Sequence, residues 1–156
     1  SEVLRMDPLL WMELFLHLAD MSYPLKPFKI CQAWAKCCLE ELFDQGEEER
    51  HRGIPIGLLN DRQKVDPPSF QHAFVQFLVS PLVIKSVKVF PMLHILTTNL
   101  VLNMEEWQIL WVQHAKPSRQ DITKREAQIS KIRDEVTDLH AFLMRDPLNS
   151  EAETKI

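Results

Sequence analysis

The chain has 156 residues, 46% of them apolar and 26% charged, as expected for a globular domain with its own hydrophobic core. The formal net charge of −4 argues against nucleic acid as a partner, because phosphate backbones select basic surfaces. With only three glycines against ten prolines, the long apolar-periodic stretches favour helices joined by proline-marked turns.

The first expected helix opens at Asp7-Pro8, where aspartate suits the N-cap and proline the first turn, and it ends near Asp20. Because it is apolar on most faces, we expect it to be central in the domain. The second is expected from Pro27 to Gln45, with Gly46 as its stop. Spacings of three and four predict a shared face in this second helix, made of Phe28, Cys31, Trp34, Cys38 and Leu42.

Residues 47–52 are charged and are interpreted as a solvated turn, followed by a loop up to Pro68. A third helix is expected from Pro68, with a kink at Pro81, and a fourth over residues 92–113. The apolar side of the third helix is predicted to include Phe74, Phe77, Leu78, Leu82 and Val83.

Residues 74–102 form the most apolar region, but lysines, prolines and a histidine interrupt it. A transmembrane helix needs about twenty mostly apolar residues, so we expect no membrane segment and interpret the region as buried core. No signal peptide is visible, and a first residue other than methionine is consistent with a fragment of a longer protein.

A charged segment follows residue 113, and its apolar positions recur in steps of three and four. This seam spans only two heptads, so it predicts either packing back on the domain or a homodimer. From residue 146 the chain is expected to fray. The seam consists of Ile129, Ile132, Val136, Leu139 and Leu143.

No strand-type alternation is convincing, so the predicted fold class is all-α. We expect one compact domain over residues 1–113 and a charged helical tail over residues 114–156.

The chain has three cysteines, Cys31, Cys37 and Cys38. Their odd number and their position in one short stretch argue against a disulfide framework, and no further ligand lies nearby at the spacing of a zinc site. We therefore expect free thiols, a reducing compartment and a cytoplasmic location, with membrane association through other regions left open.

Residues 17–27 contain the residues that could form a functional site. Asp20 sits at the end of an apolar helix, where a carboxylate is costly to bury unless it is paired or bound to a metal. Divalent cations favour such oxygen ligands, and His17 lies one turn earlier on the same face. Taken alone, the pattern also fits a capping aspartate beside a core histidine.

The same segment resembles the H-x-A-D-x-S-x-P-x-K-P signature of class I 3',5'-cyclic nucleotide phosphodiesterases. The resemblance covers residues 12–111 and implies the C-terminal half of an all-α, HD-type catalytic domain. Similar elements follow in the family's order: Trp34, the E-F-x-x-Q-G-D-x-E run at 41–49, Q-x-G-F at 71–74, x-P-L at 80–82 and N-x-x-x-W at 103–107.

The resemblance implies hydrolysis of cyclic AMP or cyclic GMP to the 5'-monophosphate by a hydroxide that two divalent metals activate, zinc with magnesium or manganese. Asp20 matches a metal ligand, and His17 matches a neighbouring histidine that does not touch the metal.

The resemblance also assigns the base-binding positions. Gln71 matches the glutamine that holds the purine edge, and an amide can serve adenine or guanine depending on how it is turned. Phe74 matches the aromatic that stacks on the base, Cys38 its aliphatic partner, and Tyr23 a variable position facing the base. The alternatives are a core role for Phe74 and a surface role for Gln71.

Departures from the family pattern leave the base preference open. Ala73 replaces the usual glycine, Cys38 a larger aliphatic side chain, Tyr23 the common asparagine and Glu47 an aspartate.

The family's H-N-x-x-H and H-D elements do not occur in this chain. We therefore assign no catalytic residue here and expect the general-acid histidine and the other metal ligands upstream. One carboxylate cannot build a site that normally needs three or four ligands, so the isolated chain should bind metal poorly and hydrolyse little. The alternatives are a non-enzymatic helical interaction module and a degenerate phosphodiesterase that binds nucleotide as a regulator.

Overall fold

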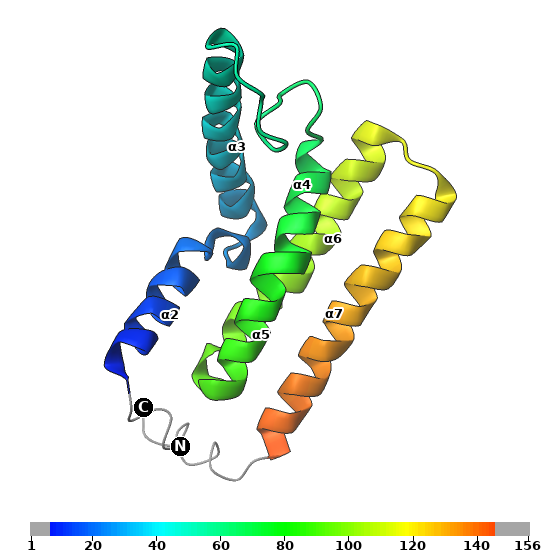
Figure 1. The fold of residues 1–156 in the computed structure, drawn as a ribbon. Helices are drawn as coiled ribbons and strands as arrows, with labels where there is room; N and C mark the ends of the chain where they lie inside the picture. Colours follow the sequence, from blue (N-terminus) through cyan, green and yellow to red (C-terminus); the bar gives the residue numbers. More distant parts are fainter. Residues whose placement is uncertain (1–6, 146–156) are drawn as a thin grey trace.

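The computed structural model describes residues 7–145, and this part of the chain is helical with no strand. It confirms the all-α prediction. Helices α4 and α5 run on as one central rod, with α6 behind it, α7 along one side and α2 and α3 along the other (Figure 1). The elements are α2 (Pro8–Asp20), η1 (Tyr23–Leu25), α3 (Phe28–His51), α4 (Pro67–Phe74), η2 (Val75–Val79), α5 (Ser80–Val89), η3 (Pro91–His94), α6 (Ile95–Ala115) and α7 (Arg119–Arg145).

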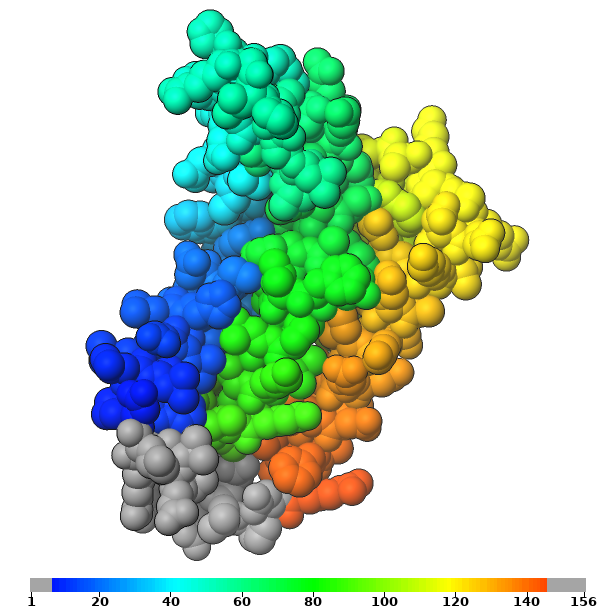
Figure 2. Space-filling view, viewed as in Figure 1, coloured from blue at the N-terminus to red at the C-terminus, as the bar shows by residue number. Residues whose placement is uncertain are grey.

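The main hydrophobic core lies between the central rod, α6 and α7. The apolar seam of α7 is buried in this core, so this helix packs back on the domain (Figure 2). The predicted domain boundary after residue 113 stays a prediction, and the predicted fraying from residue 146 lies outside the described residues. The α7 side chains in the core are Ile129, Ile132, Val136 and Leu139.

Helix α2 has the predicted bounds but not the predicted position. Asp7 caps it by accepting a hydrogen bond from the Leu9 backbone N–H at 2.9 Å. The prediction that this helix is central is wrong, because Leu18 is its only buried residue among those described and Leu16 is 67% exposed. Apolar character on all faces gives no direction of burial, and here most of the helix remains on the surface.

Helix α3 continues past Gly46 to His51, so the predicted stop at Gly46 is wrong. A β-carbon on Gly46 would lie 2.0 Å from the Asn60 carbonyl oxygen, which shows that this glycine lets the following loop cross the helix. The helix ends at His51 instead, and Gly53, two residues later, has the φ of 68° that suits a glycine just past a helix end.

The charged segment at 47–52 is exposed apart from the half-buried Glu49, as predicted, but it forms the end of α3 and its cap rather than a turn. Glu49 accepts hydrogen bonds from the Gly57 backbone N–H at 2.7 Å and from Asn60 Nδ2 at 3.0 Å. Arg62 donates to Glu47 at 3.1 Å from the far end of the same loop. These contacts fasten the 52–66 loop to α3 and so fix where α4 begins.

The third helix is irregular just before Pro81, close to where a kink was predicted. Proline lacks an N–H and its ring crowds the preceding turn, and the π-turn η2 widens the helix there. The Ser80 hydroxyl also donates to the Val75 carbonyl at 2.9 Å. The predicted apolar side was wrong in part, because Phe77 is 67% exposed and Leu78 is also exposed. The buried side is Val75, Val79, Val83 and Val87.

The stretch Pro67–Val89 is long and apolar enough to cross a membrane by length and composition alone. One such helix is weak evidence, because the core helix of a globular protein passes the same test. Its valine side packs in the core formed with α6 and α7, as expected of a core helix.

Candidate functional site

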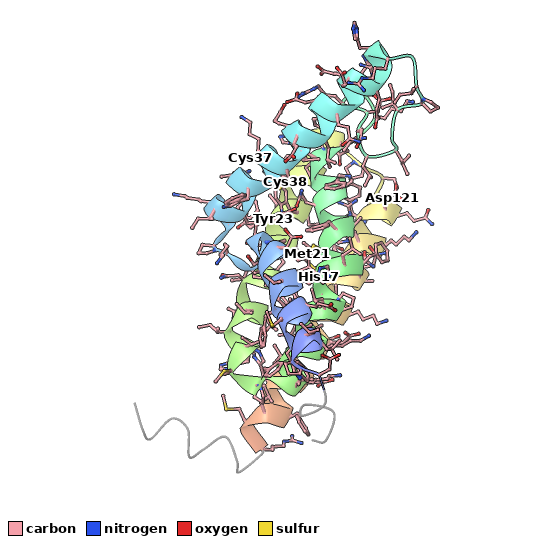
Figure 3. All side chains as sticks on the ribbon, turned by 60° about the vertical axis from the view of Figure 1, so that its left-hand side comes forward. His17, Met21, Tyr23, Cys37, Cys38 and Asp121 are labelled. Carbon is pink, nitrogen blue, oxygen red and sulfur yellow. The ribbon has the colours of Figure 1, made fainter. Side chains whose placement is uncertain are left out.

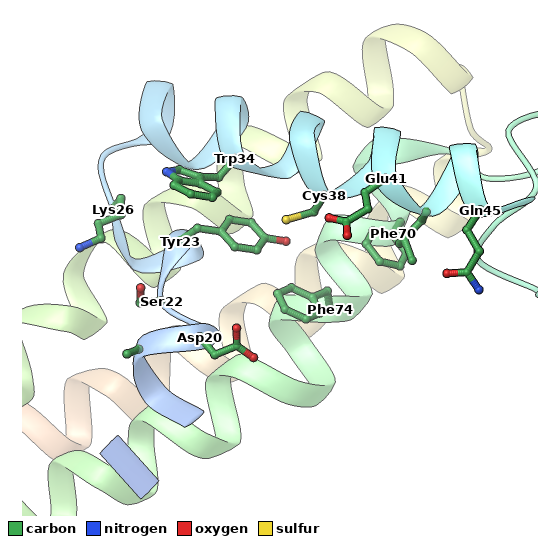
Figure 4. Close-up of a pocket in the computed structure, with 12 residues that line it drawn as sticks. Asp20, Ser22, Tyr23, Lys26, Trp34, Cys38, Glu41, Gln45, Phe70 and Phe74 are labelled. Atoms are coloured by element: carbon green, nitrogen blue, oxygen red, sulfur yellow. The ribbon is translucent and has the colours of Figure 1, made fainter. Parts of the chain in front are cut away.

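A pocket of about 610 Å³ opens where the end of α2, η1, α3 and α4 meet (Figure 4). Asp20 enters it from α2, Tyr23 from η1, Cys38 from α3 and Phe74 from the end of α4. The remaining lining residues are Ala19, Ser22, Lys26, Trp34, Glu41, Leu42, Gln45 and Phe70.

The turn that follows Asp20 and carries Tyr23 is held by hydrogen bonds from α6. The buried Asn103 donates from Nδ2 to the Pro24 carbonyl at 2.7 Å and to the Lys26 carbonyl at 2.8 Å. Asn99, one turn earlier, donates to the Leu25 carbonyl at 3.0 Å. Three consecutive carbonyls of the turn are therefore satisfied by two α6 amides, which fixes the turn against the core.

Tyr23 joins η1 to α4 through two contacts. Its hydroxyl donates to Gln71 Oε1 at 2.8 Å, and its ring stacks on Phe74 with centroids 5.6 Å apart and an interplanar angle of 6°. Phe70 continues the stack at 6.3 Å from Phe74. Burial raises the pKa of the Tyr23 phenol well above its ordinary value, so it is a neutral donor at physiological pH.

Gln71 is fully buried and lies behind Tyr23 rather than on the pocket wall. Asp20 and Phe74 line one concave surface, and Gln71 is not among the residues that line it. The carbonyl oxygen of the Gln71 amide accepts the hydrogen bond of the Tyr23 hydroxyl. Gln71 Nε2 has no hydrogen-bond partner among residues 7–145.

The α3 wall has an apolar and an acidic part. Trp34, 57% exposed, and Cys38 lie one turn apart, and Glu41 and Gln45 follow on the same side. The residues predicted to share one face of α3 therefore divide between two surroundings. Trp34, Cys38 and Leu42 line the pocket, whereas Cys31 is buried against Trp107 of α6.

Among the three thiols, Cys31 is buried, Cys38 is half-buried and Cys37 is exposed, and all are free. Burial raises the pKa of Cys31 to about 11 and, with the neighbouring Cys37, raises that of Cys38. Figure 3 shows Tyr23 and Cys38 near the junction of α2 and α3. The two shifted thiols are neutral at physiological pH, as expected for unreactive cysteines.

His17 is exposed on α2 and does not line the pocket, although it lies one turn before Asp20 (Figure 3). Within the described range, no three His, Cys, Asp or Glu side chains come together as a metal-binding group. The pocket carboxylates are Asp20 and Glu41, which is fewer than the three ligands of an ordinary divalent site. The described residues by themselves therefore do not build a complete metal site.

His72, next to Gln71 on α4, points to the other side of that helix. It is 3% exposed, and its Nε2 lies 3.3 Å from Gln128 Oε1 on α7. Burial, together with the nearby charge of Arg125, lowers the pKa of His72 from 6.5 to about 4.

This depressed pKa predicts an acid-sensitive fold. The unfolded chain takes up a proton at His72 near its ordinary pKa, whereas the folded chain resists protonation down to about pH 4. The free energy of unfolding should therefore fall as the pH drops from about 6.5 towards 4. Urea titrations across this range should show a shallower decline for His72→Gln than for the parent chain, and equal slopes would contradict the prediction.

Sequence reasoning missed several pocket residues, among them Lys26, Glu41 and Phe70. Helical spacing from Trp34 and Cys38 could have found Glu41, because they share one face of α3. Lys26 is the lysine of the family-like pattern at residues 17–27, so that pattern could have pointed to it. Phe70 carries no such signal, since its place depends on how α4 meets α3.

The sequence model for "3'5'-cyclic nucleotide phosphodiesterase" matches residues 3–100, which is well over half of the chain. The chain is 34% identical over 108 residues to the Caenorhabditis elegans "Probable 3',5'-cyclic phosphodiesterase pde-3", covering 67% of this chain and 16% of that protein. It is 34% identical over 73 residues to the human "High affinity cGMP-specific 3',5'-cyclic phosphodiesterase 9A", covering 47% of this chain and 12% of that protein.

A third relative is the Bos taurus "Dual specificity calcium/calmodulin-dependent 3',5'-cyclic nucleotide phosphodiesterase 1B", 36% identical over 77 residues, which cover 49% of this chain and 14% of that protein. The matches thus span 16% or less of the relatives' own length. The match to the family model at residues 3–100 includes every helix that lines the pocket. The chain therefore belongs to the 3'5'-cyclic nucleotide phosphodiesterase family.

Proposed function

We propose that the pocket between α2, η1, α3 and α4 binds the base of a 3',5'-cyclic nucleotide, in an enzyme that hydrolyses the cyclic phosphate to the 5'-monophosphate. The observation that carries this proposal is that Asp20 and Phe74, which match a metal ligand and the base-stacking aromatic of this family, line the same pocket. They are 54 positions apart in sequence, so only folding brings them together.

Each wall of the pocket suits a part of such a ligand. The Tyr23 ring is stacked on Phe74, so a base would stack on Phe74 by displacing the Tyr23 ring. Stacking on an aromatic ring stabilises a base by about 1–3 kcal/mol. Cys38 lines the α3 side, where a base stacked on Phe74 would meet it. Lys26 is the cation at the pocket wall and suits an anionic phosphate.

The polar edge of the base is assigned to Gln71 and Tyr23 together. With Gln71 Oε1 accepting from the Tyr23 hydroxyl, the Nε2 donor is the amide group left without a partner. A ligand that reaches this donor must displace or slide past the Tyr23 ring, so Tyr23 controls access to Gln71.

Asp20 is proposed as one metal ligand in the complete catalytic domain, with further ligands and the general acid supplied by polypeptide outside this chain. Two divalent metals, zinc with magnesium or manganese, would there activate the attacking hydroxide. His17 is proposed to support Asp20 without contacting the metal. Accordingly, we expect the 156-residue chain on its own to show little hydrolysis, and we place the enzyme in the cytoplasm.

Replacing Phe74 by alanine tests the base pocket. In a protein that carries the complete catalytic domain around this chain, we expect KM for the cyclic nucleotide to rise about tenfold or more, because stacking of about 1–3 kcal/mol is lost. Steady-state kinetics with both cyclic AMP and cyclic GMP measure the change. The matched control is Phe77→Ala, an exposed ring outside the pocket on the same rod. Equal KM values for the two variants would contradict base binding here.

A non-enzymatic interaction module would have depended on the apolar seam of α7. That seam is used within the domain core, so it gives no support to a homodimer.

A further inference from the structure

Helix α7 lies beyond residues 3–100, which the family's sequence model matches, yet it contacts α4, the helix that carries Gln71 and Phe74. Arg125 donates from Nη2 to Ser69 Oγ on α4 at 2.9 Å. One turn further, Gln128 meets His72 at 3.3 Å, with His72 Nε2–H as the donor. Arg125 also lies over the Trp111 ring of α6, 3.6 Å from its centroid, which anchors this end of α7 on the core.

Helix α4 packs mainly on α6, and hydrogen bonds and ring contacts hold it on two further sides. Ser69 and His72 are three residues apart and face α7, whereas Gln71 and Phe74 are three residues apart and meet Tyr23. A rotation or shift of α4 away from α7 would change the hydrogen bond of Gln71 and the stacking of Phe74 together.

Helix α4 begins the rod that η2 and α5 continue, but its regular part is only eight residues long before the π-turn, where the regular i to i+4 hydrogen bonds are interrupted. A regular stretch of this length has little stability of its own, so the placement of α4 against η1 and α3 depends on tertiary contacts.

We propose that Arg125 and Gln128 are positioning residues of the base pocket, acting through Ser69 and His72 to hold α4 where Gln71 and Phe74 meet Tyr23. The pocket geometry follows from the contacts above. Only the consequence for nucleotide affinity depends on the proposed function.

The chain contains a single tyrosine, so ¹³Cζ-tyrosine labelling of the full 156-residue chain gives one resonance, that of Tyr23. Its chemical shift reports the hydrogen bond from Tyr23 to Gln71. For the double variant Arg125→Ala/Gln128→Ala we expect this resonance to move towards that of solvent-exposed tyrosine. The matched control is Arg133→Ala, which removes the ion pair of α7 with Glu105 on α6 and leaves α4 untouched.

An unchanged Tyr23 resonance in the double variant, at unchanged helix content by circular dichroism, would overturn the proposal. An equal shift in Arg133→Ala would overturn it too, because the effect would then be general loosening of α7. If the double variant fails to fold, Gln128→Met keeps the length of the side chain and removes only its amide. The same shift is then expected in that variant, and its absence would overturn the proposal.

A second measurement separates this proposal from the proposed function. In the complete catalytic domain, Arg125→Ala/Gln128→Ala should raise KM about tenfold with kcat nearly unchanged, because a shifted α4 places Gln71 and Phe74 less well for the base. A tenfold change in KM corresponds to about 1.4 kcal/mol. A shifted Tyr23 resonance with an unchanged KM would support the positioning role and contradict base binding in this pocket. A raised KM without the shift would contradict the positioning role.

Discussion

Replacing Asp20 by asparagine is expected to lower kcat of the complete catalytic domain about a thousandfold while leaving nucleotide affinity largely intact. Asparagine keeps the size and one oxygen of the side chain but removes the negative charge that would hold a divalent cation. Metal ions supply several kcal/mol of charge stabilisation, and each 1.36 kcal/mol corresponds to about tenfold in rate. Hydrolysis of both cyclic nucleotides, with metal content measured on the same samples, tests the expectation.

Glu41→Gln is the matched control for Asp20→Asn. Both carboxylates line the pocket, but only Asp20 is proposed as a metal ligand. We expect Glu41→Gln to retain its metal and to lose far less activity. Full turnover in Asp20→Asn would remove the metal-ligand role from this residue. An equal loss in both variants would show that the negative charge of the pocket, rather than ligation, is what matters.

Replacing Asn103 by alanine is expected to cost the largest amount of stability among the changes considered. Its amide satisfies the carbonyls of Pro24 and Lys26, and the substitution leaves both without their donor. An unsatisfied buried group costs about 1–3 kcal/mol, so the free energy of unfolding should fall by roughly 2–5 kcal/mol. Urea denaturation of the 156-residue chain measures this loss.

Asn99→Ala provides the graded comparison for Asn103→Ala. Asn99 makes one bond, to the Leu25 carbonyl, and is itself only half-buried, so its loss should cost about 1 kcal/mol. Similar costs for the two variants would show that the turn is not held chiefly by Asn103. Because this turn also carries Asp20 and Tyr23, Asn103→Ala should in addition lower activity in the complete domain.

Several features were determined by the sequence alone. The first turn of α2, with Asp7 and Pro8, and the irregular helix before Pro81 follow from local backbone chemistry. The all-α class follows from helical periodicity and the scarcity of glycine. The order of the family motifs was also readable, because it depends only on residue identity and spacing.

The tertiary structure decided the features that depend on which surfaces meet. Glycine often ends a helix, so Gly46 was predicted as a stop. The Asn60 carbonyl lies so close to Gly46 that this glycine instead allows the following loop to cross α3. The exposure of α2 could not be predicted, since a helix apolar all round gives no preferred side.

The candidate site divides in the same way. Asp20 and Phe74 were identified from their motifs, whereas the burial of Gln71 behind Tyr23 arises from the contact between η1 and α4. A hydrogen bond between residues 48 positions apart leaves no local pattern in the sequence. Local patterns thus determined the helices and the chemical types of the site residues. Long-range packing decided which of those residues face the pocket.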